Sequence, residues 1–162
     1  MSWTEIESIT LGSPAASVTF SSGLTAYKFF RLTVYILNDA NAKNIQVRFN
    51  NDSGSNYTRQ AVSAASTGVS GERPAATTSV EINTGNNITA SETASVQVLV
   101  AKPAAGVKGQ VVYSHGYNAS PSLILGGAEW NNTADLISRI DVIALSNTFA
   151  AGTSILLEGL SF

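Results

Sequence analysis

The only histidine, His115, lies in the aromatic run Tyr113-Ser114-His115-Gly116-Tyr117 and is the first candidate for acid–base chemistry. A catalytic triad would also need an oriented acid and a nucleophilic serine. Neither Ser114 nor Ser120 stands in the Gly-x-Ser-x-Gly pattern of a nucleophile elbow. A single histidine in a chain without cysteine also cannot build a histidine- or thiolate-based zinc site. We therefore predict no catalytic residues, and a histidine at a strand end or in a turn.

Carboxylates are the second candidates. The 11 acidic residues show no distinctive grouping, and a glycosidase would require the fold to bring two of them together across a cleft. The pattern Asn50-x-Asp52-x-Gly54-x-Asn56 places oxygen-bearing side chains around a glycine, as calcium loops do, but lacks the closing bidentate glutamate. We expect solvated surface acids, an ordinary turn at this pattern, and neither a metal nor a cofactor.

Aromatic side chains could form a platform for sugar rings, because an aromatic face next to Asn and Gln can stack on carbohydrate. The members of such a platform would be Trp130, Tyr57, Tyr113 and Tyr117. The competing interpretation is that these large rings pack in the core. The sequence leaves three candidate interaction residues: Trp3, Tyr117 and Trp130.

The composition limits the classes of partner. Apolar residues make up 44% of the 162 residues, which excludes a disordered chain, whereas charged residues make up only 12%, against about 25% in typical soluble domains. The nine basic residues are scattered singly, so we expect no binding to nucleic acid or to an anionic membrane surface. No apolar run approaches the length of a membrane span, and the acidic start of the chain does not resemble a signal peptide.

Alternating apolar residues predict a chain made of strands. Residues 27–37 give the clearest case, with Phe30, Leu32, Val34 and Ile36 on the face expected to meet the core. Residues 45–49 are predicted to form a hairpin-like pair with that strand. Further strands are predicted at residues 17–20, 57–62, 80–82, 94–100, 110–115, 123–125 and 154–160. Eight to ten short strands without intervening helices indicate an all-β, antiparallel β-sandwich, jelly-roll-like.

Three segments need separate interpretation. Residues 133–145 fit a helical stripe through Leu136, Ile140 and Ile143, but their β-branched residues favour a strand from about residue 137. Residues 63–79 are Ala-, Ser-, Thr- and Gly-rich and form a long connection that is either mobile or contacts a neighbour. Residues 1–16 are expected to be an N-terminal arm, followed by a single domain at residues 17–162.

Two stretches resemble a known family. VRFNNDSGSNY at residues 47–57 resembles an F-N-x-D-x-G-x-N-Y segment of small β-sandwich structural proteins of tailed phages, and FAAGTSILLEGL at residues 149–160 resembles the F-x-x-G-T-x-I-x-L-Y-G ending of the same proteins. Trp130-Asn131 and Ile137-Ser138-Arg139-Ile140 fall where that group has a Trp-Asn pair and an I-x-x-I segment. Glu158 departs from the family pattern, because it stands where the usual residue is tyrosine.

The resemblance implies a jelly-roll component of a virion, assembled in the host cytoplasm. Its expected role is that of a non-enzymatic capsid decoration (cement) protein that binds the major capsid protein or other virion proteins, as a homo-oligomer and often a homotrimer. Residues 1–16 and 63–79 would then serve as clamps. The alternatives are a carbohydrate-binding module or a tail or fibre receptor-binding module, and a hydrolase would require at least two converging acids in a cleft.

Overall fold

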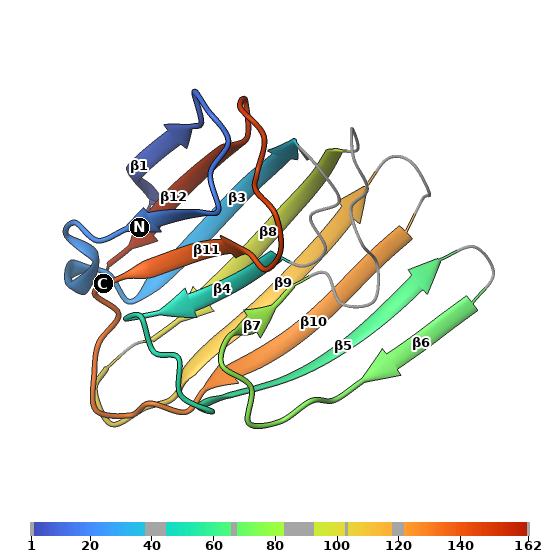
Figure 1. Ribbon diagram of the computed structural model, residues 1–162. Coiled ribbons are helices and arrows are strands. Elements are labelled where there is room, and N and C mark those ends of the chain that lie inside the picture. Colours follow the sequence, from blue (N-terminus) through green and yellow to red (C-terminus); the bar gives the residue numbers. More distant parts are fainter. Residues whose placement is uncertain are drawn as a thin grey trace.

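The chain folds into two antiparallel β-sheets packed face to face (Figure 1). The computed structural model describes residues 2–37, 45–65, 68–82, 93–102, 104–117 and 122–161, without the side chains of Ala65, Tyr117 and Ser122. The large sheet has the strand order β1-β12-β3-β8-β9-β10-β5-β6, and the small sheet has the order β2-β11-β4-β7. The strands are β1 (Thr4–Thr10), β2 (Ser17–Phe20), β3 (Phe29–Leu37), β4 (Ile45–Phe49), β5 (Tyr57–Ala65), β6 (Gly68–Glu72), β7 (Val80–Glu81), β8 (Thr93–Ala101), β9 (Gly109–Tyr117), β10 (Ser122–Trp130), β11 (Ile140–Ala144) and β12 (Ser154–Leu160). A 3-10 turn, η1 (Leu24–Ala26), precedes β3.

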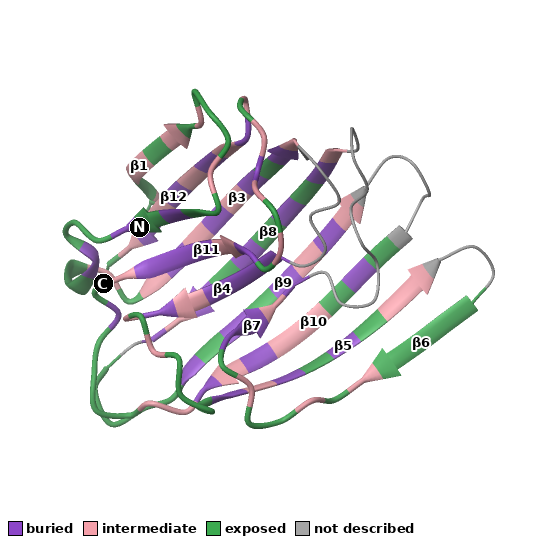
Figure 2. Ribbon diagram, in the orientation of Figure 1, coloured by how far each residue is buried: buried purple, intermediate pink, exposed green. Residues whose placement is uncertain are grey.

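The core lies between the two sheets and is formed by strands in which buried apolar residues alternate with exposed ones. Along β8, Val96, Val98 and Val100 are buried while the residues between them are exposed (Figure 2). Because successive side chains of a strand point to opposite faces, each such strand contributes one apolar row to the interior. The predicted all-β sandwich is therefore confirmed. No helix long and apolar enough to cross a bilayer occurs in the described part of the chain.

The predicted strand at residues 27–37 is β3, and its four predicted core residues are buried. The predicted hairpin between β3 and β4 is wrong, because β3 pairs with β12 and β8 in the large sheet, whereas β4 pairs with β11 and β7 in the small one. Alternation shows which face of a strand is buried but not which strand lies beside it. The two strands belong to different sheets instead, and the connecting residues 38–44 lie outside the described residues.

Residues 63–79, predicted as a connection, contain strand structure. β5 continues to Ala65, and β6 pairs with it from Gly68 to Glu72. The small residues of this stretch have weak strand preference, but β5 is also paired along its length with β10. The neighbouring strand therefore overrides the local preference, and a two-strand extension takes the place of the expected loop.

In the N-terminal segment, residues 4–10 form β1 and pair with β12 at the edge of the large sheet. In the ambiguous segment, the strand interpretation is confirmed from Ile140 onward as β11. Ile137, where we expected the strand to begin, is buried but lies before it. Asn50 fixes the irregular segment that precedes β11. Its side-chain oxygen accepts hydrogen bonds from the backbone N–H groups of Ser138 and Arg139, at 2.8 and 3.1 Å.

Candidate interaction surface

The face of the large sheet that points away from the small sheet exposes apolar side chains. Strand register places Leu99 opposite Val112 and Leu125 opposite Val62 on this face. Val112 is 61% exposed and Leu125 is 47% exposed, although each lies in the middle of its strand. We call the exposed set the outer apolar face: Val62, Val69, Leu99, Val112, Leu123 and Leu125.

Charged side chains lie around this face rather than within it. Arg31 is the neighbour of Leu99 on β3, and it forms an ion pair with Glu158 on β12. Lys108 and Glu129 form another pair at 3.0 Å. Between these two ion pairs, the polar side chains on the same face are uncharged. Gln97 on β8 and its cross-strand partner Ser114 on β9 are examples. An apolar centre with a polar rim is the arrangement typical of protein–protein interfaces.

An open depression of about 920 Å³ lies over β9, β10, β5 and β6 within the outer apolar face, and Glu72 and Arg73 line it on the β6 side. Its walls include Val62, Val112 and Leu125, and glycines occupy the positions between them. Gly127 lies opposite Val112, and Gly71 lies opposite Val62. A Cβ added at either glycine would find no neighbour nearer than 3.7 Å, so both side-chain positions are open to a partner's side chain.

Trp3 lies at the rim of this surface. Its half-buried ring stacks on the Arg31 guanidinium, whose carbon is 4.8 Å from the ring centroid. The guanidinium also donates two hydrogen bonds to Glu158, at 2.6 and 2.7 Å, and these bonds lower the pKa of that carboxyl. Arg31 is the direct cross-strand neighbour of Glu158, so the ion pair gives a structural reason for a glutamate at this position.

Trp130 does not lie at a surface. Its side chain is fully buried, with Phe49 at a centroid distance of 5.5 Å. Tyr57 and Tyr113 are buried as well, so these three rings cannot stack on a sugar from solvent. The reason is the alternation of β5, β9 and β10, which turns these rings inward. The third candidate, Tyr117, ends β9, and its side chain lies outside the described residues.

The calcium-like segment is a turn that supports Trp130. Asp52 accepts hydrogen bonds from the indole Nε1 at 2.8 Å, from the Gly54 N–H at 3.0 Å and from the Asn56 amide at 2.9 Å. The backbone enters the left-handed region at Asn50, with φ 51°, a conformation that asparagine tolerates better than most residues. The carboxylate oxygens that calcium would need are occupied by these donors. Among the described residues, no three acidic or histidine side chains form a group that could hold a metal.

His115 points into the core rather than into a cleft. It is 1% exposed and stands between Val96 and Ile124 in the strand register. Burial lowers the pKa of the imidazole to about 4, because the charged form loses its hydration. The side chain is therefore neutral at physiological pH and is not placed to exchange protons with a substrate.

This burial predicts a pH-dependent stability. The unfolded chain binds a proton at His115 near pH 6.5, whereas the folded chain does so only near pH 4, so the contribution is complete above pH 6.5 and is lost as the pH falls toward 4. The loss at pH 4.5 is on the order of 2 to 3 kcal/mol. Urea unfolding of wild type and His115→Leu at pH 7 and pH 4.5 should give a smaller acid-induced loss in the variant. Equal losses in the two proteins would contradict the prediction.

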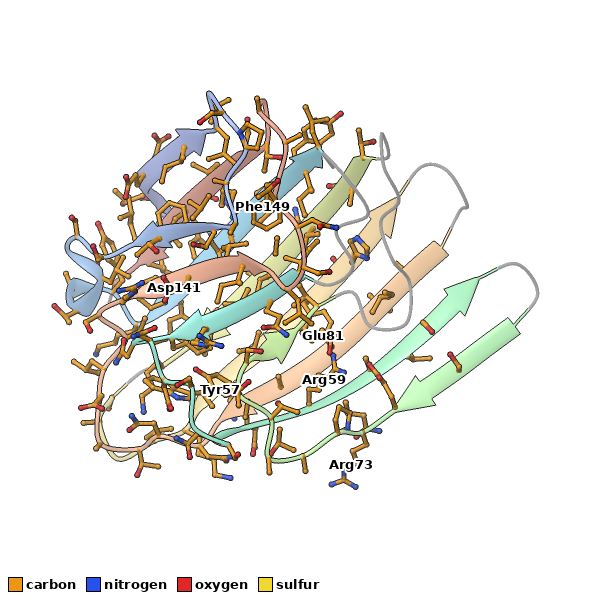
Figure 3. All side chains as sticks on the ribbon, viewed as in Figure 1. Tyr57, Arg59, Arg73, Glu81, Asp141 and Phe149 are labelled. Carbon is orange, nitrogen blue, oxygen red and sulfur yellow. The ribbon has the colours of Figure 1, made fainter. Side chains whose placement is uncertain are left out.

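An ionic cluster around the buried Arg59 joins β5, β6 and β7, and the sequence analysis did not identify it. Arg59 is 7% exposed, and its guanidinium lies 3.0 Å from Glu81 and 3.4 Å from Glu72. Figure 3 shows Arg59 and Glu81, a residue of β7, close together. Burial raises the pKa of Glu81, and Arg59 opposes this rise. Two acids do converge here, but both are bound to the same guanidinium, so the cluster ties the β5–β6 hairpin to the small sheet.

Comparisons with known proteins identify no family. No protein-family model matches the sequence, and no curated protein matches it. Among solved structures, the galectin LEC-6 of Caenorhabditis elegans matches with 10% identity and a TM-score of 0.39, over 96% of each chain. A protein of unknown function from Shewanella oneidensis MR-1, SO2946, matches with 10% identity and a TM-score of 0.23, over 98% of this chain and 76% of that one.

Proposed function

We propose that this chain is a non-enzymatic structural protein of a tailed-phage virion, a capsid decoration protein that docks on the outer capsid lattice through the outer apolar face. The observation that carries the proposal is the exposure of six valine and leucine side chains on one sheet face. Soluble proteins rarely leave a large contiguous apolar surface open to water unless a partner covers it.

The two segments that resemble phage structural proteins support this setting. Residues 47–57 include the end of β4 and the turn whose Asp52 binds the Trp130 indole. Residues 149–160 include β12, which lies between β1 and β3 in the large sheet. Both segments build the scaffold rather than a reactive site. The neutral, buried His115 and the guanidinium-bound Glu72 and Glu81 agree with a role in assembly.

The proposed partner is the major capsid protein or another virion protein. Its contacting surface would be apolar at the centre, to enter the depression between Val62, Val112 and Leu125. Around that centre it would offer polar groups to the rim formed by Arg31, Trp3 and the Lys108–Glu129 pair. Burial of the centre supplies the affinity, and the charged rim sets the orientation.

The test is binding of the purified chain to virus particles that lack it. We expect the wild-type chain to bind and to raise the temperature at which the particles release their genome. Leu125→Glu should bind at least about 100-fold more weakly, because it buries a charge at the interface centre. The matched control is Leu145→Glu, which changes a leucine of similar exposure (54%) that follows β11 of the small sheet.

Three outcomes would contradict the proposal. One is absence of the polypeptide from purified virions. Another is equal binding by the Leu125→Glu and Leu145→Glu variants. The last is specific binding to a glycan array that Leu125→Glu abolishes, because this result would assign the outer apolar face to a carbohydrate.

A further inference from the structure

We propose that β6 pairs antiparallel with β6 of a second copy, so that the two large sheets join across a two-fold axis. The expected product is an isologous dimer with a continuous sheet. Among the described strands, none pairs with the outer edge of β6 (Figure 1). The N–H and C=O groups along a free edge are available to a further strand.

The four sheet edges are not equally protected against pairing. β1 carries Glu5 and Glu7, and the register shifts between them; charges and bulges are devices that block an edge. In the small sheet, the edge strands β2 and β7 have only four and two residues. β6 has five residues, of which only the last, Glu72, is charged. It is therefore the edge with the least protection against another strand.

The sequence of β6 matches itself in the antiparallel orientation. With Ser70 on the two-fold axis, Val69 of one copy lies opposite Gly71 of the other, on the outer face. Val69 is 73% exposed, the most exposed of the large apolar side chains that the structure describes. The open side-chain position at Gly71 adjoins Val62 and the depression. Each Val69 would therefore pack beside a vacant position in the other copy, and the outer apolar face would continue across the axis.

Charge favours this partner over the other long edge. In the β6–β6 register, each Glu72 lies opposite Gly68, and the two carboxylates stand at opposite ends of the pair. Pairing of β6 with β1 of another copy would instead bring Glu72 onto a strand that carries Glu5 and Glu7. Like charges facing each other across strands are destabilising. Pairing of β6 with β6 of the second copy is therefore favoured over pairing with its β1.

The test is sedimentation equilibrium of the purified chain with Val69→Lys. We expect a dimer for wild type and a dissociation constant raised about 100-fold or more in the variant, because the symmetric contact contains the substitution twice. Val112→Lys is the matched control, since Val112 is 61% exposed on the same face but lies on the interior strand β9. Melting curves of both variants check that they fold.

The outcomes separate the modes of association. Loss of the dimer with Val69→Lys but not with Val112→Lys supports edge pairing. Equal loss in both variants would indicate face-to-face stacking and overturn it, as would a monomer at about 100 μM or the trimer that the resemblance to phage structural proteins implies. The measurement uses the isolated chain without particles, so its result does not depend on the proposed role in a virion.

Discussion

Replacement of Trp130 by alanine is expected to lower the free energy of unfolding by about 3 to 5 kcal/mol. The ring is fully buried and packs against Phe49. It also receives the ammonium group of Lys102, 5.6 Å from the ring centroid. The variant would leave a large cavity and remove the indole donor from Asp52. Denaturant unfolding followed by circular dichroism measures the loss.

Trp3→Ala is the control, because the chain has only two tryptophans. The Trp3 ring is half-buried and contacts the Arg31 side chain, so its removal should cost about 1 kcal/mol or less. Equal losses in the two variants would contradict the core assignment of Trp130. The comparison also matters for function, since any change of sugar or particle binding in Trp130→Ala would report unfolding rather than a lost contact.

Trp130 also explains why the segment with Asp52 has its unusual pattern of polar residues. Asp52 connects the buried indole to the Gly54 backbone and to Asn56. Asn50 reaches the approach to β11 from the same turn. The pattern is therefore explained by the closure of one end of the sandwich, with Asn50 and Asp52 as acceptors and Asn56 as a donor.

The strands that could be predicted from sequence are those with one buried and one polar face. The predicted bounds of β12 agree with the structure, and β3 differs by two residues at its start. Strands without that contrast were missed or shortened. β10 was predicted only at residues 123–125, because Gly126 and Gly127 interrupt its pattern, and β6 has a single large apolar residue, Val69. Their pairing depends on neighbouring strands that local sequence does not specify.

The interaction surface could not be located from sequence, because the sequence of a strand does not tell whether a given valine faces the core or the solvent. A signal was nonetheless present. β9 contains Val111-Val112-Tyr113 and β10 contains Leu123-Ile124-Leu125, and such consecutive apolar residues must point to both faces of a sheet. In an antiparallel sandwich only one of those faces is in the core. Arg59 is the converse case, a charge at an inward position of β5, which requires acidic partners.

Alanine at Gly126 is expected to destabilise the fold by about 3 kcal/mol or more. Its Cβ would come within 2.6 Å of three atoms of the Tyr113 side chain, Cζ among them. Tyr113 is 1% exposed and lies directly across from Gly126 in the β9–β10 register. The ring lies over the glycine, so any side chain there must displace a buried aromatic residue. Thermal and urea unfolding of the variant measure the effect.

Gly127→Ala is the matched control on the opposite face of the same strand. Its Cβ would contact only the Val111 carbonyl oxygen, at 3.7 Å, so folding should be retained, with a gain of about 0.5 kcal/mol from the lower entropy of the unfolded chain. The methyl group would occupy the depression between Val112 and Gln60, so this variant should bind particles more weakly although it is at least as stable as wild type. Equal destabilisation by the two substitutions would mean that Tyr113 does not pack on Gly126. Unchanged particle binding by the stable Gly127→Ala protein would place the capsid contact outside the depression.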